Sequence, residues 1–155
     1  MKGAETVNWN KDKSILLSQI CTALFALLLA ALDIGCYWAV GWFIGLRGMA
    51  WQTGAALMVT IYLCSVFAWF LLFHLWKLLD NMKKGLVFIE DNVKRLRVVS
   101  WCCVGAAVIC FASCAYYLPF LFVSIAAAFM ALIVRIVKNV FQQANAMKSE
   151  LDFTV

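Results

Sequence analysis

Three long stretches of the chain carry no charged residue, and they constrain its fold more than any other feature. Nineteen uncharged residues lie at 14–32, twenty-nine at 48–76 and thirty-seven at 98–134. A helix that crosses a membrane needs roughly 20 apolar residues to cover about 30 Å of hydrocarbon. The first two stretches therefore hold one spanning helix each, whereas the third is long enough for two short helices.

Pro119, the single proline of the chain, divides the third stretch. Proline is favoured at the first position of a helix, because its missing N–H would find no partner there in any case. The sequence therefore predicts an all-α membrane protein, residues 1–155, that forms one domain with four transmembrane helices. The expected spans are 15–38, 50–76, 98–118 and 119–138.

The overall composition supports this prediction and excludes several classes of protein. Apolar residues make up 66% of the chain and charged residues only 14%, and the mean hydropathy is +0.91. Soluble domains are about half apolar and about a quarter charged. A chain of this size is mostly surface when folded, so it could not bury its excess apolar side chains. A soluble enzyme, a secreted disulfide scaffold and a disordered tail are therefore disfavoured.

The basic residues predict the orientation of the helices. If both chain ends and the connection at 77–97 share one side, Arg47 is the only basic residue on the other side. Basic residues accumulate on the cytoplasmic side of membranes, so both termini and the connection at 77–97 are expected in the cytoplasm. The net charge of +5 then reflects topology and attraction to anionic lipid, not direct contact with nucleic acid. The twelve basic residues of the cytoplasmic side are Lys2, Lys11, Lys13, Lys77, Lys83, Lys84, Lys94, Arg95, Arg97, Arg135, Lys138 and Lys148.

The cysteines predict helix packing rather than chemistry. None of the seven forms a C-x-x-C pair, and the only histidine, His74, lies in a different predicted helix from most of them. We therefore expect no metal site, no cofactor and no catalytic residue, and hence no enzyme. Four small residues recur every fourth position, which lets helices approach closely. This stripe consists of Cys102, Ala106, Cys110 and Cys114.

Asp33 and Arg47 are the only charged residues on or near the predicted outer half of the membrane. Asp33 lies roughly 27 Å along a helix that starts at residue 15, so it is expected near the outer interface. It could pair there with Arg47, or form with it the outer mouth of a transport pathway. Proton-coupled exporters usually carry an ionisable residue within the membrane, and none is predicted here.

The connection at 77–97 is predicted to be a cytoplasmic helical hairpin that extends the second and third helices. Gly85 is expected to end the second helix in a left-handed conformation. Glu90 and Asp91 place negative charge at the start of the third helix, where the helix dipole favours it. Each is followed four residues later by a basic residue, Lys94 and Arg95, an order that stabilises helices. The tail at 139–155 is likewise predicted to extend the fourth helix.

Two segments resemble a family of small bacterial four-helix membrane proteins that is catalogued as a domain of unknown function. The matching residues are Gly85-x-x-Phe88 leading into Asn92-Val93-x-Arg95-Leu96-Arg97, and the closing Glu150-x-Asp152-x-Thr154-Val155. Val87 and Ile89 depart from the family, which often has a proline and a capping Ser or Thr there. Members are often encoded beside a Cro/CI-type helix-turn-helix regulator, so the resemblance implies a membrane partner that tethers or inhibits such a protein.

The leading hypothesis is therefore a non-enzymatic protein, embedded in the lipid bilayer of the bacterial inner membrane, that binds a cytoplasmic helix-turn-helix regulator. Two alternatives remain open, which are a component for transport or permeation of ions or small molecules, and an accessory structural subunit or homo-oligomer held by the small-residue stripe. The residues expected to bind the partner are Phe88, Asn92, Arg95 and Arg97 in the hairpin, and Glu150, Asp152 and Phe153 at the tip of the tail.

Overall fold

The computed structural model describes residues 3–87 and 89–153, and most of them lie in four helices. These are α1 (Gly3–Arg47), α2 (Trp51–Lys83), α3 (Glu90–Ser113) and α4 (Phe120–Phe153). No strand occurs in the described residues. All four helices are long and apolar enough to cross a membrane. The predicted all-α, four-helix membrane fold is thereby confirmed.

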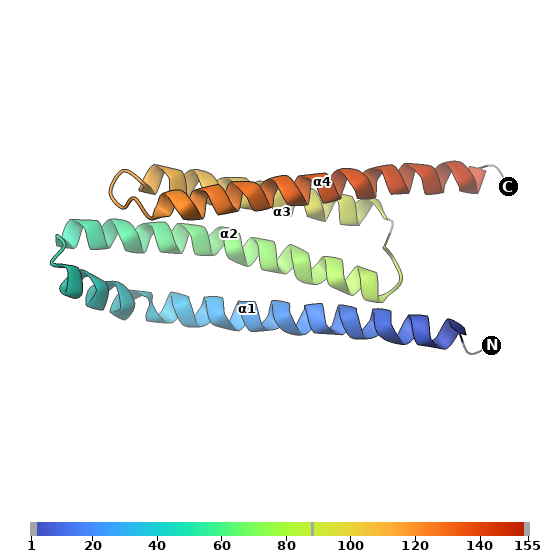
Figure 1. Ribbon diagram of the computed structural model, residues 1–155, viewed down its shortest axis with the longest axis horizontal. Coiled ribbons are helices and arrows are strands. Elements are labelled where there is room, and N and C mark those ends of the chain that lie inside the picture. The colour runs from blue at the N-terminus through green and yellow to red at the C-terminus, as the bar shows by residue number, and fades with distance from the viewer. Residues whose placement is uncertain (1–2, 88, 154–155) are drawn as a thin grey trace.

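Helices that follow one another in sequence run antiparallel along the long axis of the molecule (Figure 1). Both chain ends and the connection between α2 and α3 lie at one end of the molecule, which we call the terminal end. The α1–α2 and α3–α4 connections lie at the other end, called here the opposite end. Segments that are distant in sequence, such as the α2–α3 connection and the end of α4, therefore share one end of the protein.

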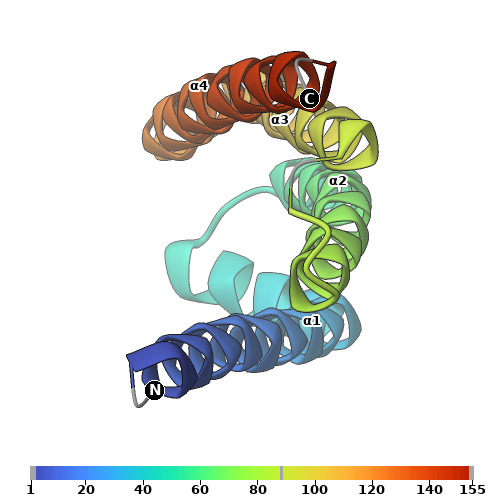
Figure 2. The same ribbon diagram turned by 90° about the vertical axis from the view of Figure 1, so that its right-hand side faces the viewer.

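The four helices form an open, C-shaped bundle (Figure 2). Each helix packs against its neighbour in sequence, and in the described part of the chain no Cα atom of α1 lies within 8 Å of a Cα atom of α4. The inner helix α3 lies between α2 and α4 and has more buried residues than α2. They include Val99, Cys103, Ala107 and Cys110. The outer helices α1 and α4 leave much of their surface exposed.

Apolar side chains cover the outside of the protein, and polar ones lie between the helices. Leu27, Ile34 and Phe122 are 70–74% exposed, whereas Thr60 and Ser113 are almost completely buried. In water this distribution would be unstable, because exposed apolar area is not removed from solvent. In a membrane it is favourable, since lipid solvates the apolar surface and polar groups must find partners inside the protein.

The first helix is longer than predicted and continues to Arg47, nine residues beyond the expected end of the first span. Val40 and Ile44 in this added part are buried against Leu57 of α2, so packing favours the continued helix. The chain then turns back within three residues. Gly48 has a φ of +60°, a left-handed conformation that glycine adopts without steric cost.

The third helix ends at Ser113, whereas the predicted span continued to residue 118. The backbone turns here because the amides of Tyr116 and Tyr117 both donate to the Ser113 carbonyl. The turn directs both tyrosines into the bundle, and the ring of Tyr117 packs edge-on against Phe43 of α1 at 5.9 Å. Pro119 directly precedes α4, within one residue of its predicted place at the start of a helix.

Candidate functional site

The end of α2 is set by two backbone hydrogen bonds that require a glycine. The amide of Gly85 donates to Met82 O at 3.1 Å, and the amide of Leu86 donates to Asn81 O at 3.0 Å. This pair of bonds satisfies carbonyls that have no partner within the helix, and it places Gly85 in a left-handed conformation. The observed φ of +74° confirms that Gly85 ends the second helix as predicted.

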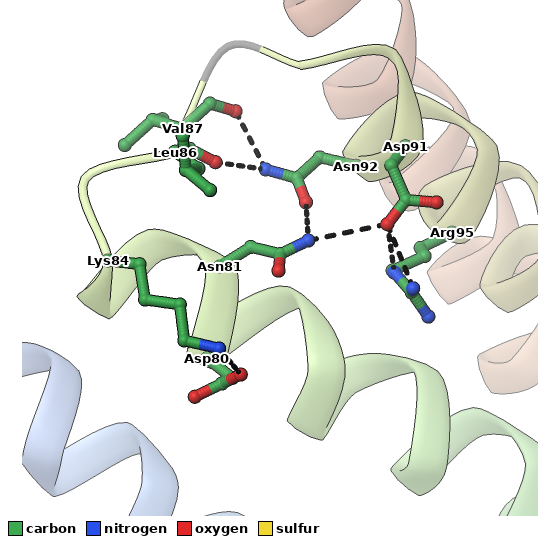
Figure 3. A network of polar contacts seen from close by, with 8 residues as sticks. All are labelled: Asp80, Asn81, Lys84, Leu86, Val87, Asp91, Asn92 and Arg95. Atoms are coloured by element: carbon green, nitrogen blue, oxygen red, sulfur yellow. Dashed lines mark hydrogen bonds and ion pairs between the residues drawn. The ribbon is translucent and has the colours of Figure 1, made fainter.

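Asn92 holds the α2–α3 connection in place (Figure 3). Its Nδ2 donates to the carbonyls of Leu86 and Val87, both at 2.8 Å, and its Oδ1 accepts from Asn81 Nδ2 at 2.8 Å. Asn92 is completely buried, and its side chain uses both of its amide protons and its oxygen. One side chain thereby ties the end of α2, the connecting segment and the start of α3 together.

Two ion pairs stabilise the first turns of α3 as predicted. Arg95 contacts Asp91 at 2.8 Å, and Lys94 lies 4.0 Å from Glu90. Asn81 Nδ2 also lies 3.4 Å from Asp91, so the Arg95 pair is connected to the hydrogen bonds of the hairpin (Figure 3). The Arg95 side chain is only 21% exposed, whereas that of Lys94 is 71% exposed.

A further ion pair lies at the end of α2, where Lys84 Nζ donates to Asp80 at 2.7 Å. The hydrogen bond from Lys84 lowers the pKa of the Asp80 carboxyl, and nearby lysines add to this effect. A lowered carboxylate pKa favours the folded state above the pKa of the unfolded chain, and this contribution is lost as the pH falls. The Asp80 carboxyl is therefore charged at neutral pH and accepts the bond from Lys84.

A groove of about 520 Å³ separates the start of α3 from the last turns of α4. It lies at the terminal end, beside the hairpin just described, and both predicted partner-binding segments contribute to it. The Oδ1 atom of Asn145 in this groove is enclosed and accepts no hydrogen bond in the described part of the chain. The lining residues are Glu90, Val93, Lys94 and Arg97 from α3, and Gln142, Asn145, Ala146, Lys148 and Ser149 from α4.

The structure separates the predicted partner-binding residues into different groups. Arg97 lines the groove, and Glu150 is exposed on α4 directly after it. The assignment of Asn92 to a binding surface is wrong, because its side chain is fully buried and bonded within the hairpin. Arg95 is paired with Asp91 and does not line the groove. Phe88, together with the side chains of Asp152 and Phe153, lies outside the part that the structure describes.

Asp33 is the centre of a polar cluster between α1 and α2. Ser65 Oγ donates to its Oδ2 at 2.7 Å, and Trp69 Nε1 donates to the same oxygen at 3.0 Å. The hydroxyl of Tyr62 donates to the backbone carbonyl of Asp33 at 3.2 Å. The second carboxylate oxygen, Oδ1, is enclosed and has no hydrogen-bond partner among the described residues.

The depth of this cluster corrects the prediction for Asp33. Its partner Ser65 lies about 21 Å along α2 from Trp51 and about 18 Å from Lys77, at 1.5 Å per residue. Asp33 is therefore level with the middle of the uncharged part of α2 and not near the outer interface. The predicted pair with Arg47 is also wrong, since the two residues are about 21 Å apart along the same helix. Arg47 instead lies over the ring of Phe43.

A second buried polar cluster joins α2 to the α3–α4 connection. Thr60 Oγ1 lies 2.9 Å from Ser113 Oγ and also bonds the hydroxyl of Tyr116. Tyr116 in turn donates to the carbonyl of Ala56 at 3.2 Å. These bonds satisfy polar groups that the surrounding lipid could not, so the cluster has a structural role at the opposite end.

The small-residue stripe packs inside the protein. Cys102 and Cys110 are buried, while Ala106 and Cys114 are half-buried, and Cys110 Sγ lies 3.7 Å from Cys64 Sγ of α2. The two most buried residues of the stripe are therefore covered by the chain itself. This arrangement leaves little of the stripe exposed to a second copy of the chain. It therefore disfavours a homo-oligomer in which this stripe forms the contact.

The side chains that surround Asp33 are not among the predicted site residues. Tyr62, Ser65 and Trp69 are spaced by three and four residues, so they lie on one face of α2. This spacing in an otherwise apolar segment is a signal for a polar face inside the bundle. It does not reveal which residue of another helix the face contacts, and only the packing of α1 on α2 brings Asp33 to it.

Comparison with known proteins places the chain in a family. Neither the curated proteins nor the solved structures contain a match to it. The matched region of the family profile begins within α1 and includes α2, α3 and α4 completely. It thus contains the hairpin, the groove and the Asp33 cluster. Because this profile, described as "Protein of unknown function (DUF2975)", matches residues 22–155, the chain belongs to the DUF2975 family of proteins of unknown function.

Proposed function

We propose that this chain is a non-enzymatic protein of the bacterial cytoplasmic membrane that holds a small helix-turn-helix transcription regulator at the membrane surface. The observation that carries the proposal is the groove between the start of α3 and the end of α4. It lies between the hairpin and the tail, which carry the two motifs of the family resemblance. Arg97 of the first motif lines the groove, and Glu150 of the second directly follows it. The identity of the partner is implied by that resemblance, and no direct contact with nucleic acid is proposed.

The distribution of charge supports the orientation that this function needs. Of the basic residues in the described part of the chain, Arg47 alone lies at the opposite end, beside the α1–α2 connection. The others lie toward the terminal end. Since basic residues accumulate on the cytoplasmic side, we propose that the terminal end, with its groove, faces the cytoplasm.

The groove has the chemistry of a protein-binding surface. Its two walls are helices, and a groove between helices can accept an amphipathic helix of a partner. Lys94, Arg97 and Lys148 make the lining mainly basic. The basic lining is complementary to an acidic helix of the partner, and the exposed Glu150 beyond the groove can face a basic surface of the same partner. Such complementary charges favour specific docking.

A tryptophan in the groove is expected to abolish recruitment of the partner. Ala146 is exposed on the α4 wall, so Ala146→Trp fills the groove without replacing a core residue. The amount of regulator that co-purifies with N-terminally tagged protein should fall about tenfold or more, as for the loss of a central contact. Removal of residues 139–155 should have the same effect, while insertion into the membrane continues.

The matched control is Met147→Trp, at the next position of α4, which is exposed but does not line the groove. It should leave recruitment at the wild-type level. If Ala146→Trp and the truncated protein recruit the regulator as the wild type does, the proposed binding surface is wrong. If no helix-turn-helix protein co-purifies with the wild-type protein, the assignment of the partner fails.

Transport or permeation is a second candidate function, favoured by the position of Asp33. A carboxylate within the span is expensive in lipid and typical of proton relays, and one of its oxygens has no partner in the described residues. If Asp33 carries protons, vesicles containing the purified protein should acidify faster than empty vesicles under an imposed proton gradient. Asp33→Asn should reduce this rate to that of empty vesicles, because an amide does not exchange a proton in this way.

The control for this measurement is Asp80→Asn, which removes a carboxylate at the exposed terminal end. A pH-sensitive dye enclosed in the vesicles reports the acidification. Equal rates for wild-type vesicles and empty vesicles would exclude proton permeation. Equal rates for the wild type and Asp33→Asn, both above that of empty vesicles, would exclude Asp33 as the proton carrier.

A further inference from the structure

Three basic side chains converge in a pocket of about 260 Å³ between α3 and α4. Arg97 comes from α3, and Arg135 and Lys138 come from α4. No acidic residue lines this pocket, and none of the three cations forms an ion pair with a carboxylate of the described residues. This differs from the neighbouring Arg95, which is paired with Asp91. The pocket therefore has an uncompensated positive charge and is suited to an anion.

The position of the pocket along the helices corresponds to the membrane boundary. Arg97 is the last charged residue before the uncharged stretch of α3 and α4, and Arg135 is the first one after it. Trp101, which also lines the pocket, is 65% exposed. Tryptophan is enriched at the level of the lipid headgroups. These residues thus place the positive pocket at the depth where phosphate groups of a bilayer lie.

An apolar groove of about 350 Å³ continues directly from this pocket along the surface of α3 and α4. The two cavities share Ser100, Val104 and Arg135, so they form one continuous cleft. The groove extends from Ser100 as far as Phe111, about 17 Å along α3. This length is close to half of the roughly 30 Å hydrocarbon core, which is the depth of one leaflet.

The polar atoms of the groove are already satisfied within the protein. Ser100 Oγ donates to the Ala131 carbonyl at 3.1 Å, and Ser124 Oγ donates to the Ala107 carbonyl at 2.9 Å. These bonds link α3 and α4 below the groove and leave no hydroxyl proton for an occupant. The groove therefore offers an apolar surface, and the basic pocket lies at one end of it.

We propose that this cleft binds one anionic phospholipid of the surrounding bilayer. Its phosphate is bound by Arg97, Arg135 and Lys138, and one acyl chain lies in the groove along Val108, Phe111 and Leu132. A phosphodiester and an apolar chain joined together match the two parts of the cleft in chemistry, order and depth. Basic pockets between transmembrane helices bind anionic headgroups in this way. Bound lipid would also join α3 to α4 beside the groove for the partner.

The test is a lipid titration of the detergent-solubilised, full-length protein, followed by native mass spectrometry. Phosphatidylglycerol should bind at one site, roughly tenfold or more tightly than phosphatidylcholine, since the phosphatidylcholine headgroup has no net charge. Arg97→Gln combined with Arg135→Gln should remove this preference. The matched control is Lys77→Gln combined with Lys83→Gln, which removes the same charge from α2 outside the cleft.

A second pair of variants tests the acyl-chain groove. Ala128→Trp fills the groove without removing a charge, and it should weaken binding of phosphatidylglycerol about as much as the double arginine variant. Ala126→Trp, on the same helix but outside the groove, should bind lipid as the wild type does. Melting curves without added lipid show that each variant is folded.

Three results would overturn the proposal. The first is equal affinity for phosphatidylglycerol and phosphatidylcholine in the wild type. The second is unchanged binding in both the double arginine variant and Ala128→Trp. The third is complete competition by glycerol phosphate at the concentration of the lipid, since the pocket would then bind free phosphate groups and the groove would contribute nothing.

Discussion

Replacement of Asn92 by leucine is expected to release the connection between α2 and α3. Leucine has a similar size but no polar atoms, so the variant loses three hydrogen bonds of 2.8 Å at once. The carbonyls of Leu86 and Val87 lose the side-chain amide that donates to them, and the side-chain amide of Asn81 keeps only its longer contact of 3.4 Å to Asp91. At about 1 kcal/mol for each hydrogen bond, the loss is about 3 kcal/mol, and it is larger where a group stays buried without water.

Hydrogen exchange at the backbone amides of residues 84–87 and thermal unfolding in detergent measure this effect. Both should change strongly in Asn92→Leu, with faster exchange and a lower melting temperature. The control on the same hairpin is Lys84→Ala, which removes an exposed ion pair to Asp80. Such pairs contribute about 0–1 kcal/mol, so little change is expected. Wild-type exchange in Asn92→Leu would show that the hairpin does not depend on this side chain.

Replacement of Gly105 by leucine is expected to separate α2 from α3. A Cβ atom at Gly105 would lie 2.7 Å from Cε1 of Phe67, closer than side chains approach one another. Phe67 is half-buried between the helices, and its ring is too rigid to yield without a rotamer change. Overpacking of this kind costs about 1–3 kcal/mol. Close packing is also a main source of helix association in membranes.

Gly41 provides the matched control for this substitution. It lies within α1, and a Cβ atom at this position would meet nothing within 4 Å. Both variants gain the same helix propensity when glycine is replaced by leucine, about 1 kcal/mol. The difference between their melting temperatures therefore reports the contact with Phe67. Equal melting temperatures for Gly105→Leu and Gly41→Leu would contradict this account of the α2–α3 packing.

Several features of the fold follow from the sequence because they depend on local properties. The number of transmembrane helices follows from the length of the uncharged stretches, because the length of a helix is proportional to its number of residues. The stop at Gly85 follows from the single residue type that adopts a left-handed backbone freely. The ion pairs of Asp91 with Arg95 and of Glu90 with Lys94 follow from the helical repeat. None of these depends on which helix lies beside which.

The candidate sites depend on contacts between helices, and here sequence reasoning was partly wrong. A residue count from residue 15 predicts Asp33 at the outer interface, because such a count does not include the position of α1 relative to α2. Its partners, Ser65 and Trp69, belong to α2, so only the packing of α1 on α2 identifies them. Asn92 was predicted on a binding surface because it lies among charged residues, yet the chain folds over it and buries it completely.

The sequence alone thus determined that this is a four-helix membrane protein with most of its basic residues at one end. Hydropathy and helix length set the number of spans, and neither needs knowledge of neighbouring helices. Three features depend on the tertiary structure. The bundle is open between α1 and α4, and Asp33 of α1 lies level with the middle of the uncharged part of α2. The third feature is the pair of cavities between α3 and α4. The physical reason is that lipid solvates every apolar face equally, so hydropathy contains little information about which faces meet. That choice depends on small residues, steric fit and a few buried hydrogen bonds.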